Sequence, residues 1–489
     1  MLAFDQGTSG SRSVIFDGSG CYVSNSKIAH RQIYPAPGWV SHDPVEIFRN
    51  TVESAYQAIG AADIKAGQIE AIGVTNQRET LVAWDSETGA PVCDAVVWQC
   101  NRTAEYCERI KKDGMEREIG KRTGLVADPY FSATKIKWVL DNVPEAGSLM
   151  AKGRLKCGTV DSYLIYRLSG NKRHITDYTN ASRTMLFNIN TLEWDAELLR
   201  YFGIPEAILP EVVPSSCVSA HTDRGIFGMD IPIAGIAGDQ HAALFGQTCF
   251  NRGDVKNTYG TGCFVLKNTG DTPVYSENGL LTTIAYHVGG KAAYALEGSV
   301  FTAGAAVEWL IRETKLIKDV DDLQAACEKV PDTGGVFFVP AFTGLGAPHW
   351  DTNARGSVFG MTLSTSREHI ARAVMESIAY QSRDVIETMD MESGFPVDRL
   401  RADGGVSKSD FVMQFQADIL GKPVERPAYT ETTALGAAYL AGLGCGLFEG
   451  FNSLSGMREV GRTFTPEGGF DEGQYAMWLK AVEKSRGWA

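Results

Sequence analysis

Hydrophobic and polar positions along the chain predict alternating strands and helices. Apolar runs of strand length occur at 69–75 (IEAIGVT), 231–237 (IPIAGIA) and 335–342 (GVFFVPAF). Longer segments between such runs place apolar residues at helical spacing. In the clearest helix, 367–389, an apolar face is formed by Ile370, Val374, Ile378 and Val385, with charged residues opposite. Alternation of this kind predicts an α/β fold.

Two hairpin patterns lie about half the chain apart. Residues 2–20 and 256–271 each read as a strand, a loop containing Gly-Thr, and a second strand. This repetition predicts two related α/β halves that face one cleft. An apolar HAALFGQ run gives way to polar NRGDVKN near 245–255, so we expect domains at 1–247 and 248–489. A further predicted helix, 433–443, is rich in small residues and suited to close packing.

Composition narrows the class of protein. The formal net charge of the 489 residues is −13, which argues against nucleic acid or an anionic membrane as the main partner. No run reaches the ~20 apolar residues of a membrane span. The opening MLAFDQGTSG lacks the basic and apolar regions of a signal peptide, so we expect a cytoplasmic protein. The 10 Cys and 8 His show no metal-binding spacing, and we expect no structural metal.

The first hairpin carries a candidate phosphate loop, DQGTSGSR. Asp5 at the end of a strand could hold Mg²⁺, while backbone N–H groups and the hydroxyls of Thr8 and Ser9 could cradle phosphate oxygens. Arg12 would supply positive charge. The alternative is an ordinary Gly-Ser hairpin turn.

The second hairpin has the same pattern of strand, Gly-Thr loop and strand. A second such loop favours nucleotide binding over an ordinary turn. Thr261 in NTYGTGCF could reach phosphates from the opposite half. A third Gly-rich turn, RADGGVSKSDF, opens a helix, and Gly404 and Gly405 would let a purine or ribose lie against the backbone. No Walker A motif occurs. The three turns together predict a nucleotide held in a cleft between the halves.

Two polar pairs are candidates for binding the molecule that would accept a phosphoryl group from the nucleotide. Asp239 and Gln240 follow a strand and precede a helix, at the sheet edge where α/β proteins bind ligands. A carboxylate there could accept a hydroxyl proton; the alternative is a helix N-cap. Arg78 and Glu79 follow the strand 69–75 and could bind hydroxyl groups, or could form a surface ion pair.

Longer motifs carry a family resemblance. YFSATKIKWVLDN (130–142) and GSVFGMTLSTSREHIARAVME (356–376) are similar to two family signatures, and NQRETLVAW, GIAGDQHAALFGQ, KNTYGTGCF and PAFTGLGAPHWD match as closely. The sequence resembles the glycerol kinases of the FGGY carbohydrate kinase family, within the actin-like ATPase superfamily. The resemblance covers nearly the whole chain. It implies two actin-like (ribonuclease H-like) domains around a central cleft.

The resemblance also implies a reaction and its residues. The reaction is ATP-dependent phosphorylation of glycerol to sn-glycerol 3-phosphate, the first step of glycerol utilisation, with Mg²⁺ held by Asp5 and Asp239. Asp239 would be the general base. Glycerol would be bound by Arg78, Glu79, Trp98, Tyr130, Asp239, Gln240 and Phe264. The nucleotide would be bound by Thr8, Ser9, Gly10, Arg12, Thr261, Gly304, Glu308, Gly405 and Ser409. Family members form dimers and tetramers, so we expect a homodimer or homotetramer.

Four positions depart from the family pattern. Gly10 replaces a common Ser, Glu308 a common Gln, and Ser409 an Asn that touches adenine; these changes could alter nucleotide affinity. Asp230 replaces an Arg that binds fructose 1,6-bisphosphate in some bacterial relatives, so we expect inhibition by that anion to be lost.

Two other functions stay open. One is an FGGY kinase for another polyol or a pentulose. The other is a non-catalytic actin-like scaffold that binds nucleotide, which would not need Asp239 or the Arg78–Glu79 pair.

Overall fold

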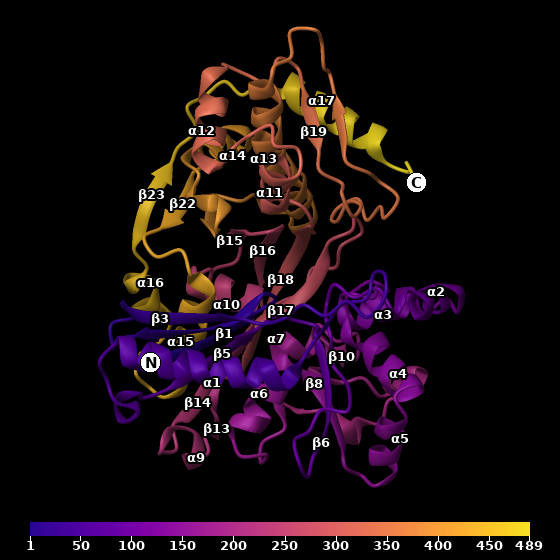
Figure 1. Ribbon diagram of the computed structural model, residues 1–489, viewed down its shortest axis with the longest axis vertical. Coiled ribbons are helices and arrows are strands. Elements are labelled where there is room, and N and C mark those ends of the chain that lie inside the picture. Colours follow the sequence, from indigo (N-terminus) through magenta and orange to yellow (C-terminus); the bar gives the residue numbers. More distant parts are fainter.

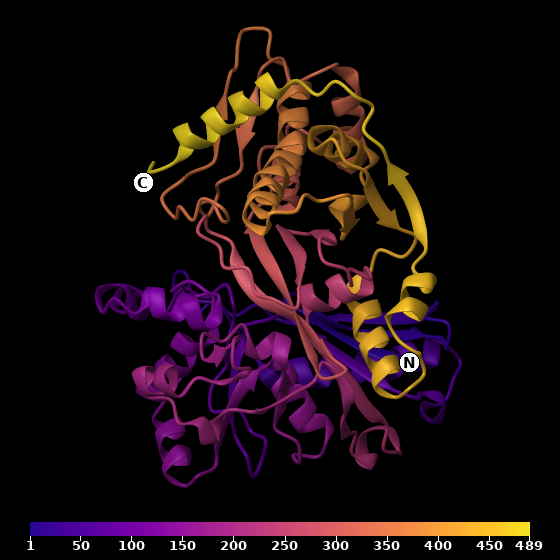
Figure 2. The same ribbon diagram turned by 180° about the vertical axis from the view of Figure 1, so that it is seen from behind.

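The computed structural model describes residues 1–489 as two lobes. In Figures 1 and 2 the first half of the chain, indigo to magenta, forms the lower lobe, and most of the second half, pink to yellow, forms the upper lobe. None of the helices combines the length and apolar character needed to cross a bilayer.

The lower lobe is built on a six-stranded mixed sheet. Its strands, in spatial order, are β13 (Ser216–His221), β14 (Pro232–Gly238), β5 (Ile72–Asn76), β1 (Leu2–Gly7), β2 (Gly10–Phe16) and β3 (Tyr22–Ala29). A four-stranded sheet lies beside it, with β4 (Ser41–His42), β7 (Ala95–Val96), β6 (Leu81–Asp85) and β8 (Leu155–Thr159). Two short pairs complete the lobe: β10 (Phe187–Asn188) with β11 (Glu193–Trp194), and β9 (Ile175–Asp177) with β12 (Glu211–Val213).

The upper lobe contains a seven-stranded sheet. Its spatial order is β17 (Leu281–Val288), β18 (Lys291–Val300), β16 (Cys263–Gly270), β15 (Val255–Tyr259), β21 (Leu400–Asp403), β22 (Val424–Pro427) and β23 (Val460–Phe464). The long strands β17 and β18 run from this lobe down toward the lower one (Figures 1 and 2). A separate pair is formed by β19 (Phe337–Val339) and β20 (Ser357–Phe359).

Helices flank both sheets. The lower-lobe helices are α1 (Pro44–Ala61), α2 (Ala104–Lys112), α3 (Glu116–Thr123), α4 (Ser132–Asn142), α5 (Pro144–Ala151), α6 (Val160–Leu168), α7 (Tyr178–Ala181), α8 (Ala196–Phe202), α9 (Arg224–Phe227) and α10 (Asp239–Gly246). Those that follow are α11 (Gly304–Arg312), α12 (Val320–Lys329), α13 (Arg367–Ser393), α14 (Asp410–Leu420), α15 (Thr432–Gly444), α16 (Phe451–Met457) and α17 (Glu472–Ser485). The strands and helices named from the sequence pattern are present with shifted bounds.

Parallel pairing brings the candidate loops together. Strand β5 lies between β1 and β14 and runs parallel to both. Because parallel strands end at the same edge of a sheet, the segments after them meet there: the turn at 8–9, the pair 78–79 and residue 239. In the upper lobe, β15 runs parallel to β21, so the turn at 260–262 lies beside Gly404.

Helix α15 crosses from the second half of the chain into the lower lobe. It packs against α10, with Gly436 facing the carbonyl oxygen of Ala242. One apolar core accordingly holds side chains of both halves, among them Phe245, Leu266 and Leu440. The spatial lobes therefore do not follow a single cut in the sequence, and the division at 247 stays a prediction.

Helix α13 buries several of its charged residues: Glu376, Arg383 and Asp384 are all buried. Helix α17 covers two of them. Asp384 accepts hydrogen bonds from the hydroxyl of Tyr475 and the indole of Trp478, at 2.8 and 2.9 Å, and Arg383 donates to Glu472 at 2.7 Å. Glu376 pairs with Arg372 of α13 itself.

Candidate functional site

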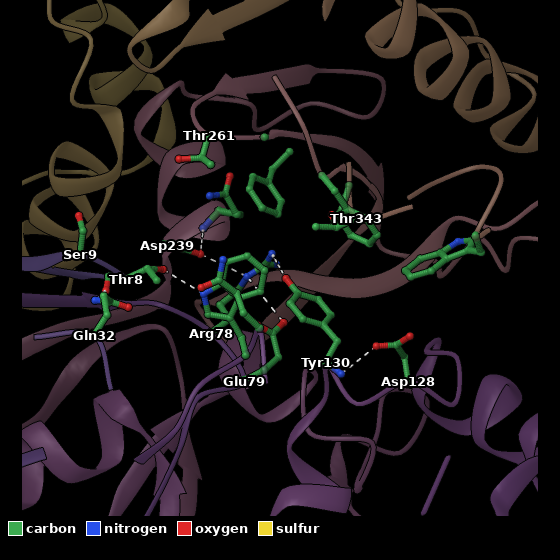
Figure 3. Close-up of a pocket in the computed structure, with 18 residues that line it drawn as sticks. Thr8, Ser9, Gln32, Arg78, Glu79, Asp128, Tyr130, Asp239, Thr261 and Thr343 are labelled. Carbon is green, nitrogen blue, oxygen red and sulfur yellow. Dashed lines mark hydrogen bonds and ion pairs between the residues drawn. The ribbon is translucent and has the colours of Figure 1, made fainter. Parts of the chain in front are cut away.

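A cavity of about 530 Å³ opens where the lobes meet (Figure 3). Ten of the residues predicted from the sequence line it: Thr8, Ser9, Arg78, Glu79, Trp98, Tyr130, Asp239, Gln240, Thr261 and Phe264. They come from both halves of the chain. A volume of this size exceeds that of a triol and leaves room for part of a second ligand.

Arg78 lies at the centre of a buried ion cluster. Its guanidinium forms two parallel hydrogen bonds with Glu297 of β18, at 2.6 and 2.8 Å, so this contact joins the two halves of the chain. The Nε of Arg78 lies 3.2 Å from Oδ1 of Asp239. Burial opposes ionisation of Glu297, but Arg183 and Arg78 outweigh it and hold the pKa of that carboxyl well below its usual range.

Glu79 pairs with a different arginine. Arg183 donates to Glu79 at 2.6 Å and also to Glu297 at 3.2 Å, whereas Nε of Arg78 is 3.9 Å from Glu79. The surface ion pair considered for Arg78 and Glu79 is therefore wrong: both side chains are at most 2% exposed, and each takes its main partner from elsewhere. Glu79 also has φ of 60°, a strained value for this residue that its buried contacts must stabilise.

Asp239 is the first residue of α10, and Gly238 occupies the N-cap position. The N-cap alternative is thereby excluded. Oδ1 of Asp239 receives both the backbone N–H of Gln240, at 2.7 Å, and the contact from Arg78. Oδ2 has no protein partner, so it is the oxygen free to accept a proton from a ligand. Burial raises the pKa of Asp239, and Arg78 opposes the shift.

Aromatic rings form the apolar walls. Trp98 contacts Tyr130 edge to face, with ring centres 5.6 Å apart, and Phe264 lies across from Trp98 at 6.5 Å. The Trp98 indole donates to the hydroxyl of Thr8 at 2.9 Å. The wall that could cover a polyol carbon chain is thus tied to the first phosphate-type loop.

The first phosphate-type loop is anchored by hydrogen bonds from residues that follow β3. The carbonyl oxygen of Thr8 accepts a hydrogen bond from Gln32 at 2.9 Å and lies 2.8 Å from Nε2 of His30. A Cβ at Gly10 would lie 2.6 Å from the carbonyl oxygen of Ile28. This close approach to β3 explains the glycine, and a serine would require β3 to shift.

Arg12 and Asp5 face each other across the β1–β2 pair. Arg12 forms an ion pair with Glu431, which precedes α15, instead of pointing freely into the cavity. Burial raises the pKa of Asp5 to about 6; Arg12 opposes the shift, and Glu431 and Asp239 add to it. Neither Asp5, Gly10 nor Arg12 lines the cavity itself.

The predicted adenosine residues lie around the second loop, beyond the cavity lining. The backbone N–H of Gly304 donates to the carbonyl of Gly260 at 3.0 Å, which seats the start of α11 on the Gly-Thr turn. A Cβ at Gly304 would lie 3.2 Å from Val406, next to Gly405. Glu308 is exposed on α11. Ser409 caps α14 by accepting the N–H of Val412.

Sequence reasoning missed several residues of this site, including eight that line the cavity. Glu297 and Arg183 complete the ion cluster, Gln32 lines the cavity, and Lys256 lies buried behind Gln240. Glu297 did carry a signal, because it is a single charge inside the otherwise apolar strand AAYALEGSV. Arg183 and Gln32 are isolated in sequence, and only the fold brings them here.

Asp230 is exposed and lies 3.3 Å from Arg224 in the loop after β13. A carboxylate here partly neutralises a neighbourhood that also contains Lys172 and Arg173. Loss of inhibition by fructose 1,6-bisphosphate stays a prediction.

Two α/β lobes whose Gly-Thr hairpins face a cleft with a carboxylate on its wall define a kinase of the actin-like class. Residues 1–246 match the N-terminal domain of the FGGY family of carbohydrate kinases, and residues 255–445 match its C-terminal domain. The chain belongs to the FGGY family of carbohydrate kinases.

Its relatives include well-covered full-length proteins. Glycerol kinase 2 of Thermotoga maritima is 55% identical over 100% of this chain and 99% of the relative. Glycerol kinase of Petrotoga mobilis is 53% identical over 100% and 98%. Among solved structures, Plasmodium falciparum glycerol kinase with ADP aligns with a TM-score of 0.91 at 38% identity, covering 99% of this chain and 97% of that one. A xylulose kinase from Lactobacillus acidophilus, 24% identical with a TM-score of 0.87, shares the fold.

Proposed function

We propose that the protein transfers the γ-phosphoryl group of ATP to a terminal hydroxyl of glycerol, forming sn-glycerol 3-phosphate as the first step of glycerol utilisation. The observation that carries this proposal is the pairing of a buried acid–guanidinium cluster with two Gly-Thr turns across one cavity. Full-length relatives named glycerol kinase support the choice of substrate.

Polyol recognition would use groups on one wall of the cavity. Arg78 and Tyr130 can donate to hydroxyl oxygens, and Glu79 can accept from hydroxyl protons. Trp98 and Phe264 would cover the carbon chain. The ion pairs that hold Arg78 and Glu79 preorganise them, so binding a small neutral ligand would cost little reordering.

Proton transfer would use Oδ2 of Asp239. This oxygen is the one left without a protein partner, and it lies on the cavity wall with 27% of the side chain exposed. The raised pKa of Asp239 makes the ionised carboxylate a stronger base than a free aspartate. It would accept the hydroxyl proton as the phosphoryl group is transferred.

The nucleotide would lie across both hairpins. Thr8, Ser9 and Gly10 would contact phosphate oxygens from below and Thr261 from above, with Arg12 released from Glu431 as charge arrives. The adenosine would lie near Gly304, Glu308, Gly405 and Ser409.

Mg²⁺ would be held by Asp5 and Asp239 with the phosphates. The residues fit this ion, since they are two hard oxygen donors that lie close enough for Asp239 to raise the pKa of Asp5. When bound, the ion would neutralise developing charge on the phosphates. We place the enzyme in the cytoplasm, and a homodimer or homotetramer remains our expectation for its assembly.

The decisive test is Asp239→Asn. It keeps the shape and the Oδ1 contacts but removes the base, so we expect glycerol-dependent ADP formation to fall by roughly 10²–10⁴-fold. Nucleotide binding, measured by calorimetry, should persist. An active Asp239→Asn enzyme would contradict the assigned role, and an unchanged cellular phenotype would favour the scaffold.

Substrate identity needs a panel of acceptors. Glycerol should give the highest kcat/KM among glycerol, xylulose, ribulose and gluconate. Faster turnover of a pentulose would replace glycerol by that substrate while leaving the family assignment unchanged.

A further inference from the structure

Lys256 is a fully buried cation directly behind Gln240 and Phe264. These two residues belong to the polyol wall, the part of the cavity lining that would contact the polyol. Lys256 lies in β15, at 0% exposure, and its Nζ has three hydrogen-bond acceptors. These are Oε1 of Gln240 at 2.5 Å, Oγ1 of Thr258 at 2.9 Å and the carbonyl oxygen of Phe264 at 3.1 Å. An ammonium group has three N–H donors, so all of its hydrogen-bonding capacity is used.

This contact determines which way the Gln240 amide points. An ammonium can only donate, so the amide atom that faces Nζ must be the oxygen. Gln240 lines the cavity, and its Nε2 has no protein acceptor. The amide therefore offers an N–H donor to the cavity, next to the Asp239 carboxylate, which offers an acceptor.

The second hydrogen bond of Lys256, to Thr258, lies on the side of the predicted nucleotide site. Thr258 is the register partner of Asp403 in the parallel β15–β21 ladder, and Asp403 is a buried carboxylate. Asp403 directly precedes the Gly404 turn. Lys256 therefore contacts groups of the polyol wall and a group anchored beside the predicted adenosine loop.

We infer that Lys256 is a positioning residue for substrate recognition, which locks Gln240 with Nε2 toward the polyol and so selects a ligand with a hydroxyl oxygen at that point. This inference rests on the proposed function. Burial lowers the pKa of Lys256 to about 8, and Asp403 opposes the shift, so the ammonium form prevails at pH 7.

The first test is Lys256→Met, with Lys267→Met as the matched control. Lys267 is a buried lysine of the adjacent strand β16, and its ammonium contacts Asp390 and Phe395 away from the cavity. We expect KM for glycerol to rise at least about tenfold in Lys256→Met, because the amide can then flip, with kcat changing less. Lys267→Met should keep the wild-type KM. Equal KM values in the two variants would overturn the inference.

A double-mutant cycle separates positioning from general destabilisation. If Lys256 acts through Gln240, Lys256→Met should raise KM little further in a Gln240→Ala background. Fully additive effects on KM would overturn the inference, because a purely structural lysine would weaken binding in either background.

Gln240→Glu keeps the test decisive even if Lys256→Met does not fold. Glutamate still accepts from Lys256 but replaces the donor by a carboxylate oxygen. We expect its KM to rise as much as in Gln240→Ala. A KM within about twofold of wild type would show that an acceptor suffices there and would refute the orientation.

Wild-type turnover is measured first. If glycerol is inert but another polyol reacts, the proposed function fails, and the same series of variants is measured with that polyol.

Discussion

The titration of Asp239 predicts how activity depends on pH. Its carboxylate must be ionised to accept a proton, and burial raises its pKa above the ordinary value of 3.8. Activity is therefore lost as pH falls through the raised pKa, at a higher pH than for an exposed aspartate. We expect kcat/KM for glycerol, measured at saturating nucleotide, to decline on the acid side at a higher pH than an exposed aspartate base would give. A profile that stays flat down to the ordinary aspartate pKa of 3.8 would contradict a carboxylate base with a raised pKa.

Asp161 predicts a pH dependence of stability. It is buried in α6, accepts from the hydroxyls of Thr159 and Thr176, and burial raises its pKa to about 7. Between the ordinary value of 3.8 and about 7, the folded protein binds a proton that the unfolded chain does not. Its contribution to stability is present below pH 4 and is lost as pH rises through 7.

Asp161→Asn should therefore gain stability relative to wild type, on the order of 2–4 kcal/mol, between pH 4 and pH 8 in urea unfolding. Asp85→Asn is the control. Hydrogen bonds from Arg154 lower the pKa of Asp85 to about 2, so its effect should not vary above pH 5. If both variants show the same pH dependence, Asp161 does not carry the effect.

The residues of the cavity show which parts of the site could be predicted from the sequence. Ten predicted residues line the cavity. Six of them closely follow β1, β5 or β14, parallel strands that end at one edge of the lower sheet. Glu297 and Arg183 could not be paired with Arg78 and Glu79 in advance. Their contacts span more than 100 positions of sequence, and which arginine meets which carboxylate depends on the packing of β18 against the lower lobe.

At the element scale, the contact of α10 with α15 depends on glycine. A Cβ at Gly436 would lie 1.8 Å from the carbonyl oxygen of Ala242, a backbone atom that cannot move without shifting α10. We expect Gly436→Ala to lower the free energy of unfolding by about 1–3 kcal/mol or more, because overpacking forces the helices apart.

Gly147→Ala in α5 is the matched control. A Cβ there meets nothing within 4 Å, so alanine should stabilise the helix by about 0.5–1 kcal/mol. Chemical denaturation of both variants checks the pair. Equal effects at the two glycines would show that close approach of α10 and α15 contributes little.

The local sequence pattern predicted the helices and strands better than it predicted which of them pack against one another. The small residues of 433–443 indicated close packing, but periodicity could not show that this helix of the second half packs on the first lobe. The pattern of α13 likewise could not show that the later helix α17 covers Arg383 and Asp384.

At the scale of the whole molecule, Glu297 joins the halves through charge. It binds Arg78 and Arg183, both from the lower lobe, while it belongs to β18 of the second sheet. Removing its charge leaves two buried guanidinium groups with weaker compensation. Loss of one partner from a buried ion pair costs about 3–5 kcal/mol.

We expect Glu297→Gln to lower the free energy of unfolding by about that amount and to separate one cooperative urea transition into two, since the lobes lose a shared anchor. Glu376→Gln provides the comparison, because Glu376 is equally buried but pairs with Arg372 of the same helix. That variant should weaken one lobe without uncoupling it from the other. A single transition of unchanged midpoint in Glu297→Gln would mean that the apolar core shared by α10 and α15 holds the lobes together and that the ion cluster serves the ligand alone. Two transitions in Glu376→Gln would show that uncoupling of the lobes is not specific to Glu297.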